Sequence, residues 1–316
     1  MSIGSIFFGR SPVEKAVASV KRREGQLIRD WIDLIEKLRA SGRLPPEVVQ
    51  HIESHEIDRT GHAVNHYASE IVSTSGPDLR SLAKQISNEN VETVAAQVVL
   101  IVIQKKSIFQ CRDSHTEGLY YAHAEPEMDW QWRMLVEPYI RDVDLSSVLE
   151  LAPGHGRNSA KLVQQGARVL HLVDVNQTCI DACRARFGDR HGVCQLFFHV
   201  TGGDTLPFIE SGSISFVYSF DSMVHFDKSI VRAYLGEFSR AMRPGATGFL
   251  HHSNFGAFHP NSDWAKNHGN RSDMSAALFR EYCAEVGLEV TGQMMHGMKE
   301  GRGMENLDCV SLIRKP

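Results

Sequence analysis

Three acidic residues and two glycines in the second half of the chain have the spacing of a nucleoside-binding site. Glu150 ends an apolar run four residues before Gly154, and Gly156 follows two residues later. Glycines at these positions allow a tight turn and let the backbone approach a ligand closely. Asp174 comes twenty residues after Gly154. A carboxylate at that distance can accept both hydroxyls of a ribose.

The remaining acids indicate which base and which tail the nucleoside has. Asp204 follows the third apolar run of this region, where it can receive the amino group of an adenine. Glu150 would repel a pyrophosphate but can help to anchor an ammonium group. Ser159 stands where a dinucleotide-binding turn has its third glycine. The pattern therefore favours a nucleoside with a positively charged amino-acid tail over a dinucleotide.

Two polar clusters end the next two apolar runs, and they contain the candidate catalytic residues. His225 is the first candidate for a general base, with Asp221 as its partner or alternative. His252 and Asn254 come next, either as the base or for hydrogen bonding to a substrate. His251 is expected to face the opposite side of its strand from His252, so it ranks lower.

The same clusters offer ligands for a divalent metal. Asp221, His225, Asp227 and His252 supply oxygen and nitrogen atoms. Magnesium prefers oxygen ligands, and no clean pair of carboxylates is visible. A metal is possible but is not favoured.

Two further segments supply candidate substrate-binding residues. Tyr120 and Tyr121 lie in a segment, 111–130, that has little periodicity and resembles a loop. Arg271 lies in a long polar insertion and can bind a carboxylate or phosphate. Together with Asn254, these residues favour a polar small molecule as the substrate.

The elements that must position these residues alternate between strands and helices after Asp144. This rhythm is typical of an α/β domain with a doubly wound parallel sheet. The five predicted strands are residues 148–151, 169–173, 195–199, 214–220 and 247–252. Two late runs, 289–295 and 307–313, have no helix between them and predict an antiparallel hairpin at the sheet edge.

The first third of the chain has a helical pattern with no alternating strand. Leu27, Trp31, Leu34, Ile35 and Leu38 recur every three or four residues, which places them on one helix face. We therefore expect an all-helical N-terminal region at 1–115, a connecting segment or lid at 116–144, and a ligand-binding domain at 145–316. The apolar helix faces make a homodimer through the helical region possible.

Composition limits the class of protein. A net charge of −4 argues against a nucleic-acid partner. The six cysteines lack metal-ligand spacing, and no secretory signal is visible, which together favour a cytoplasmic protein. The longest apolar run, 98–103, is too short to span a membrane.

From about residue 145 to 315 the chain resembles the class I S-adenosylmethionine methyltransferase family. The motifs that carry the resemblance are the glycine turn, Asp174, the run Asp204-Thr-Leu-Pro-Phe, the run Met242-Arg-Pro-Gly245 and the terminal hairpin. The resemblance implies a Rossmann-like fold and S-adenosylmethionine as the cofactor. It places Glu150, Ala152, Gly154 and Gly156 at the methionine end, Asp174 at the ribose and Asp204 at the adenine, with Phe220 also in the cofactor site. Pro153 departs from the family pattern, because proline has no amide hydrogen to donate.

The predicted activity is O-methylation of a small polar acceptor, such as a sugar or the end of a glycan. One alternative is a protein or RNA methyltransferase that uses the helical region for docking. Another is a non-catalytic binding or scaffold protein with the same fold. A nicotinamide-dependent oxidoreductase is the fourth, and Glu150 together with the missing third glycine argues against it.

Overall fold

The computed structural model describes residues 30–42, 71, 80–82, 84–85, 87, 90–114, 121–122, 124–260, 262, 270–297 and 306–316. The chain forms two compact units, Met1–Lys106 and Ser107–Pro316. The division falls inside helix α4, Val91–Ser114, rather than after residue 115. The predicted division into three segments stays a prediction.

The first unit is helical where it is described. A helix runs over residues 30–40, and an ion pair of 2.8 Å joins Asp30 to Arg80. The predicted apolar face of this helix is confirmed, because its four described members are almost completely buried. These are Trp31, Leu34, Ile35 and Leu38. The fifth, Leu27, lies outside the described residues.

Helix α4 is apolar over most of its length. By length and composition alone it is able to cross a membrane, a test that the core helix of a soluble protein also passes. Val91, Val94, Ala95 and Val98 are buried within the protein, which accounts for part of this composition. The expected absence of a membrane span stays a prediction.

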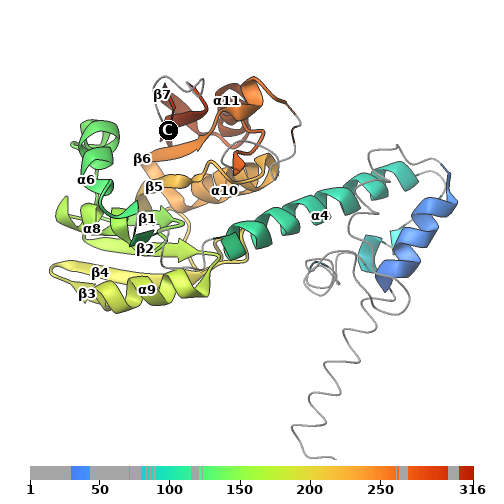
Figure 1. The fold of residues 1–316 in the computed structure, drawn as a ribbon, viewed down its shortest axis with the longest axis horizontal. Helices are drawn as coiled ribbons and strands as arrows, with labels where there is room; N and C mark the ends of the chain where they lie inside the picture. Colours follow the sequence, from blue (N-terminus) through green and yellow to red (C-terminus); the bar gives the residue numbers. More distant parts are fainter. Residues whose placement is uncertain are drawn as a thin grey trace, which may run out of the picture. The chain divides into compact units, whose positions relative to one another are not determined.

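The second unit is built on one eight-stranded sheet of order β3-β4-β2-β1-β5-β6-β8-β7 (Figure 1). Its strands are β1 Val148–Leu151, β2 Val169–Asp174, β3 Arg190–His191, β4 Cys194–Val200, β5 Ile214–Met223, β6 Met242–Ser253, β7 Glu289–His296 and β8 Asp308–Arg314. Strands β4, β2, β1, β5 and β6 are parallel, and β8 lies antiparallel between β6 and β7. The five predicted strands and the terminal hairpin are confirmed. The short β3, which pairs with β4, was not predicted.

Helices between the strands cover the sheet. They are α8 Arg157–Gln164, α9 Gln177–Phe187, α10 Lys228–Ala241 and α11 Ala276–Glu285, with a short 3-10 turn η2 at Phe255–Ala257. Helix α9 packs against β2 and β4, α10 against β5, and α11 against α10 and β7. This is the doubly wound arrangement that the alternating pattern predicts.

Alternation along β5 and β6 decides which side chains share a face of the sheet. The rings of Phe220 and His251 lie 4.8 Å apart, so these two residues share one face. His252 stacks on Phe279 of α11 with ring centroids 4.0 Å apart. Because neighbouring residues of a strand point in opposite directions, His251 and His252 belong to different layers of the domain.

The segment before β1 is part of the core, and this corrects the prediction of a connecting loop. It consists of α6 Met128–Gln131, the π-helical turn η1 Trp132–Val136 and α7 Glu137–Ile140. Met128, Trp132, Val136 and Ile140 recur every four residues and are at most 4% exposed. Trp132 contacts Tyr218 of β5 with ring centroids 6.2 Å apart. The window 111–130 contained only the first of these four positions, so the helical period was not visible in it.

We predict that Trp132→Ala lowers the free energy of unfolding by about 3–5 kcal/mol, the usual effect of truncating a buried aromatic side chain. The matched control is Trp130→Ala in the same segment, because Trp130 is 56% exposed whereas Trp132 is 4% exposed. The control should change stability by about 0.5 kcal/mol or less. Urea unfolding of the two variants makes the comparison. Equal midpoints would show that this segment does not pack on the sheet.

Candidate active site

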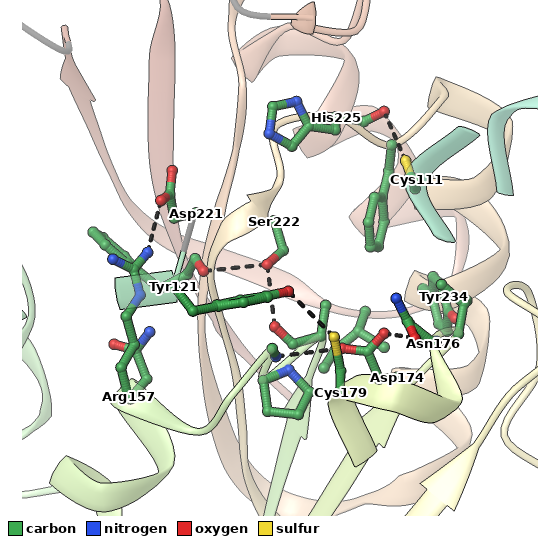
Figure 2. Close-up of a pocket in the computed structure, with 18 residues that line it drawn as sticks. Cys111, Tyr121, Arg157, Asp174, Asn176, Cys179, Asp221, Ser222, His225 and Tyr234 are labelled. Atoms are coloured by element: carbon green, nitrogen blue, oxygen red, sulfur yellow. Dashed lines mark hydrogen bonds and ion pairs between the residues drawn. The ribbon is translucent and has the colours of Figure 1, made fainter. Parts of the chain in front are cut away.

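A cavity of about 740 Å³ opens at the carboxyl ends of β1, β2 and β5, where open α/β sheets bind their ligands (Figure 2). All of its lining residues belong to the second unit. They are Cys111, Tyr121, Leu151, Ala152, Pro153, Gly154, Arg157, Asn158, Asp174, Val175, Asn176, Cys179, Phe220, Asp221, Ser222, His225, Phe226 and Tyr234.

The turn between β1 and α8 forms the floor of the cavity. Gly154 has φ +58°, and a Cβ on it would lie 2.4 Å from Cε1 of Tyr121. Gly156 has φ +81°, and a Cβ there would lie 2.6 Å from Cε2 of Phe187 in α9. The first glycine therefore keeps the cavity open below Tyr121, and the second lets α9 pack against the turn.

Ala152 begins this turn in a left-handed conformation, with φ +57°. A non-glycine residue pays about 1–2 kcal/mol for that conformation. Its amide donates to the carbonyl of Val173 at 2.7 Å, and its carbonyl accepts the hydroxyl of Ser222 at 3.2 Å. The neighbouring strands thus hold the turn in a strained conformation beside the cavity.

Asp174, at the end of β2, presents a buried carboxylate to the cavity. Its Oδ2 accepts the amide of Gly154 at 3.3 Å and its Oδ1 the amide of Asn176 at 2.9 Å. Burial raises the pKa of Asp174 to about 6, although these amides and that of Val175 oppose the shift. At neutral pH the group is an ionised acceptor suited to the hydroxyls of a ribose.

Glu150 lies under the turn rather than on the cavity wall. It is 2% exposed, and its Oε2 accepts the hydroxyl of Ser159 at 2.6 Å. Burial raises the pKa of Glu150 to about 8, against the effect of the Ser159 hydrogen bond. A carboxyl group that is neutral at pH 7 and outside the cavity does not support the predicted anchoring of an ammonium group.

Asp221 and Arg157 form an ion pair at the opposite side of the cavity from Asp174 (Figure 2). The pairing of β5 with β6 is irregular between Ser219 and Met223, and within this bulge Asp221 has φ +58°. Its Oδ2 accepts Nη2 of Arg157 at 2.7 Å. Burial opposes ionisation of Asp221, but the charge of Arg157 is the largest of the contributions that together outweigh it and hold the pKa below the usual value. Asp221 is therefore an anion, and a weak base.

His225 lies just after the bulge and lines the cavity. Its Nδ1 is 2.9 Å from the carbonyl oxygen of Asn270. Because a carbonyl oxygen only accepts, Nδ1 must carry the hydrogen, and the basic lone pair of the neutral ring is on Nε2. His225 thus has the tautomer that a general base requires.

Two cysteines also line the cavity, but they are not nucleophiles. Burial, reinforced by the charge of Asp174, raises the pKa of Cys111 to about 12 and that of Cys179 to about 12. A thiol must ionise to act as a nucleophile. The cavity is therefore suited to direct transfer between two bound molecules rather than to a covalent enzyme intermediate.

The structure brings seven of the predicted site residues together around the cavity. They are Tyr121, Ala152, Gly154, Asp174, Phe220, Asp221 and His225. Gly156 and Asp204 do not line it, although the charge of Asp204 acts on the lining residue Tyr234. Tyr120 lies outside the described residues. The roles predicted for these residues stay predictions.

Three other predicted residues do not reach the cavity. His252 is fully buried, with Nε2 2.8 Å from the hydroxyl of Ser311 and Nδ1 2.8 Å from the carbonyl of Ser253. Burial lowers the pKa of His252 to about 3. It faces α11, so its assignment as a base is wrong.

Asn254 and Arg271 are likewise buried, and their side chains bond to other parts of the domain. Asn254 accepts the first amide of α11, from Ala276, at 2.9 Å and is 5% exposed. Arg271 is 3% exposed and donates twice to Asp308, at 3.0 and 2.7 Å. Neither side chain can contact a substrate in the cavity, so both substrate-binding predictions are wrong.

The four metal-ligand candidates do not converge. Asp227 accepts the amide of Ser229 at 2.8 Å and caps the start of α10. His252 lies in the other layer of the domain, away from Asp221 and His225. These residues do not offer a shared site to a metal ion.

Several lining residues were missed, and some carried a usable signal. Arg157 and Asn158 directly follow Gly156 in the turn that opens α8, and Ser222 follows Asp221. Because these three residues are adjacent in sequence to predicted site residues, their place in the chain could have indicated them. Cys111 and Tyr234 come from helices α4 and α10 and reach the cavity only through tertiary packing.

Comparison with known proteins agrees with the geometry. Residues 148–245 match the family model described as a methyltransferase domain. No curated protein matches the chain in sequence.

Solved structures with a similar fold include three proteins of low sequence identity. Geranyl diphosphate C-methyltransferase from Streptomyces coelicolor, crystallised with S-adenosyl-L-homocysteine, is 12% identical, with a TM-score of 0.49 over 60% of this chain and 76% of that one. An S-adenosylmethionine-dependent methyltransferase from Mesorhizobium loti is 12% identical, with a TM-score of 0.48 over 59% of this chain and 99% of that one. A Pyrococcus horikoshii protein is 16% identical, with a TM-score of 0.47 over 66% of this chain and 97% of that one.

Residues 148–245 are therefore similar to a methyltransferase domain. The family model covers the strands and turns that form the cavity floor. The residues present fit such a cofactor, because the buried carboxylate of Asp174 faces the cavity and a glycine without Cβ keeps the floor open below Tyr121. Asp174 is the residue best placed to hold the nucleoside.

We predict that Asp174→Asn weakens binding of S-adenosylhomocysteine by about 10- to 100-fold, since hydrogen bonds to a charged acceptor contribute about 1.5–3 kcal/mol. The control is Asp181→Asn, which changes an exposed carboxylate on α9. Isothermal titration calorimetry measures both affinities. An affinity for Asp174→Asn within threefold of the unsubstituted protein would remove Asp174 from the binding site.

The affinity should also depend on pH through Asp174. Its pKa of about 6 in the free protein means that it ionises above that pH. Protonation removes the acceptor, so the affinity for S-adenosylhomocysteine should fall by about tenfold between pH 7 and pH 5. Asp174→Asn should lose this part of the dependence. The same slope in both proteins would assign the titration to another group.

Proposed function

We propose that the chain is an S-adenosylmethionine-dependent methyltransferase that methylates a hydroxyl oxygen of a small polar acceptor, such as a sugar or the end of a glycan. The observation that carries the proposal is a histidine of defined tautomer at the edge of the cavity. His225 donates from Nδ1 to a backbone carbonyl, so its basic nitrogen is Nε2. A hydroxyl is the acceptor group that most needs such a base.

The bound cofactor supplies an electrophilic methyl group on a sulfonium sulfur. The residues of the chain orient the acceptor and manage its proton. Nε2 of His225 takes the hydroxyl proton as the oxygen attacks, and the carbonyl of Asn270 holds the ring in position and stabilises its protonated form. The cavity wall keeps the two molecules in line, which accounts for much of the rate in such reactions.

The polarity of the cavity supports a polar acceptor. Arg157 and Asp221 lie on the side opposite Asp174 (Figure 2), and Asn158 and Ser222 also line the cavity. Tyr121, which stacks on His155 with ring centroids 3.7 Å apart, lies between the two sides (Figure 2). A flat or sugar-like molecule can pack on the ring and hydrogen bond to these polar groups.

Other acceptor classes have less support. An RNA acceptor needs a concentrated basic surface, and the chain has a net charge of −4. Two arginines near the glycine turn, Arg157 and Arg186, are paired with Asp221 and Glu125. A non-catalytic scaffold would not need a histidine of fixed tautomer beside the cavity.

Two further properties belong to the same proposal. We place the protein in the cytoplasm, because its six cysteines form no disulfide. We also propose a homodimer through the helical region. Sedimentation of the full chain at several concentrations tests the dimer, and a monomer throughout would contradict it.

We predict that His225→Ala lowers kcat by about 10²- to 10⁴-fold, the usual contribution of a general base. Binding of S-adenosylhomocysteine should stay within threefold, because the substitution leaves Asp174 and the glycine turn in place. His191→Ala, an exposed histidine on β3, is the control and should keep full activity. The measurement is transfer of labelled methyl to a panel of free sugars, nucleotide sugars and glycans, with mass spectrometry of the product. Methylation at nitrogen or carbon would contradict the proposed function, and an unchanged kcat in His225→Ala would remove the base.

A further inference from the structure

A buried polar cluster lies behind the strained residue Asp221 and contacts two cavity-lining residues, Asp221 and Phe220. The cluster consists of His251 on β6, His296 at the end of β7, Asp308 at the start of β8, and Arg271. His251, Asp308 and Arg271 are 2%, 0% and 3% exposed. None of the four lines the cavity. Neither the cofactor site nor the proposed base uses them.

The hydrogen bonds in this cluster have a defined direction. The amide of Asp221 donates to Nδ1 of His251 at 3.0 Å. A neutral imidazole that accepts on one nitrogen carries its hydrogen on the other. Nε2 of His251 is therefore the donor to Nε2 of His296, 2.9 Å away. His296 in turn donates to the backbone of Gly297.

This direction argues against a metal site, although the geometry resembles one. His251, His296 and Asp308 can each present a ligand atom within 4.8 Å of the others. A neutral histidine that binds a metal through Nε2 carries its hydrogen on Nδ1. That hydrogen would face the amide hydrogen of Asp221, and Arg271 already occupies both oxygens of Asp308. The cluster is suited to holding a backbone amide instead.

We propose that His251 is a positioning residue for methyl transfer, which holds Asp221 in its left-handed conformation by accepting its amide hydrogen. The inference rests on the proposed function, since it assigns Asp221 and Arg157 to the acceptor side of the cavity. His296 fixes the tautomer of His251, and the ion pair between Arg271 and Asp308 supports both rings from behind.

The effect reaches the cavity through the backbone of Asp221. This residue has φ +58°, a left-handed conformation that is uncommon outside glycine, although aspartate adopts it more often than most residues. Without an acceptor on His251, the buried amide would lose its hydrogen bond, and the backbone would relax out of the left-handed region. The carboxylate would then move from Nη2 of Arg157, which it contacts at 2.7 Å. The acceptor would bind beside a displaced ion pair.

The hydrogen bonds of the cluster keep the same donors and acceptors at physiological pH. Burial, helped by the neighbouring His251, lowers the pKa of His296 to about 4, so His296 stays neutral and accepts. Burial alone would raise the pKa of Asp308, but its hydrogen bonds, two of them from Arg271, hold it well below its usual range. The titratable and charged groups around His251 are Asp221, His252, Arg271, His296 and Asp308.

Two substitutions of His251 distinguish its role as a hydrogen-bond acceptor from its role in packing. In His251→Asn, the amide oxygen can take the place of Nδ1 and still accept from Asp221. The ring of His251 lies 4.8 Å from that of Phe220, and the ring in His251→Phe can keep this packing. It has no atom that can accept the amide hydrogen of Asp221. His171→Phe, a half-buried histidine on β2 away from the cavity, is the control.

We expect His251→Phe to lower kcat by about 10- to 100-fold, the range for residues that orient a catalytic group. His251→Asn should stay within about fivefold of the unsubstituted protein. All variants should bind S-adenosylhomocysteine within threefold by calorimetry, since Asp174 is unchanged. Equal kcat values for the Asn and Phe variants would overturn the proposal, because a merely structural role does not distinguish an acceptor from a ring.

A second pair of variants, at His296, tests the same contact if His251→Phe does not fold. His296→Gln retains an acceptor for Nε2 of His251, and His296→Leu removes it. Without that acceptor, His251 is free to move its hydrogen to Nδ1 and repel the amide of Asp221. Loss of kcat in His296→Leu but not in His296→Gln supports the proposal. Equal values overturn it.

Amide hydrogen exchange at Asp221 separates this inference from the proposed function. If the protein methylates nitrogen or carbon, or none of the tested acceptors, the proposed function fails. Exchange measured by mass spectrometry still tests the contact. Protection at Asp221 in the unsubstituted protein and in His251→Asn, with at least tenfold faster exchange in His251→Phe, supports the inference. The same exchange in all three proteins overturns it.

Discussion

Two neighbouring parallel strands each have a residue with left-handed backbone at or near the carboxyl end, and the active site depends on this constraint. Ala152 follows β1 and Asp221 lies at the bulge in β5. Neither is glycine, so the surrounding hydrogen bonds must hold both conformations. The hydroxyl of Ser222 joins the two by donating to the carbonyl of Ala152. The cavity floor is therefore set by the sheet.

Burial acts differently on the three acids around this floor. Asp174 is ionised at neutral pH because backbone amides offset part of the effect of burial. Glu150 has only the Ser159 hydroxyl and keeps its proton. Asp221 is ionised because a full positive charge lies against it. Three carboxyl groups within one fold thus have three different roles, and their neighbours decide which.

Much of the fold follows directly from the sequence. The alternation of short apolar runs with helices predicted the five parallel strands and the terminal hairpin, because each pattern records one local period. The glycine turn and Asp174 were also visible, since a turn of fixed geometry leads from a strand into a helix within a few residues. What the sequence determined is the cofactor half of the site, whose residues are close to one another along the chain.

The acceptor half was decided by the tertiary structure. His251 and His252 are adjacent in sequence, and nothing in their spacing tells which of them faces Asp221. The bulge in β5 places His251 on the side of Asp221, and the stacking of Phe279 of α11 on His252 buries His252 on the other side. The role of Arg271 was equally ambiguous in the sequence, because its ion-pair partner, Asp308, lies 37 residues later in the chain. Long-range packing partners decide whether a polar residue faces a substrate or the core, and a one-dimensional pattern does not contain them.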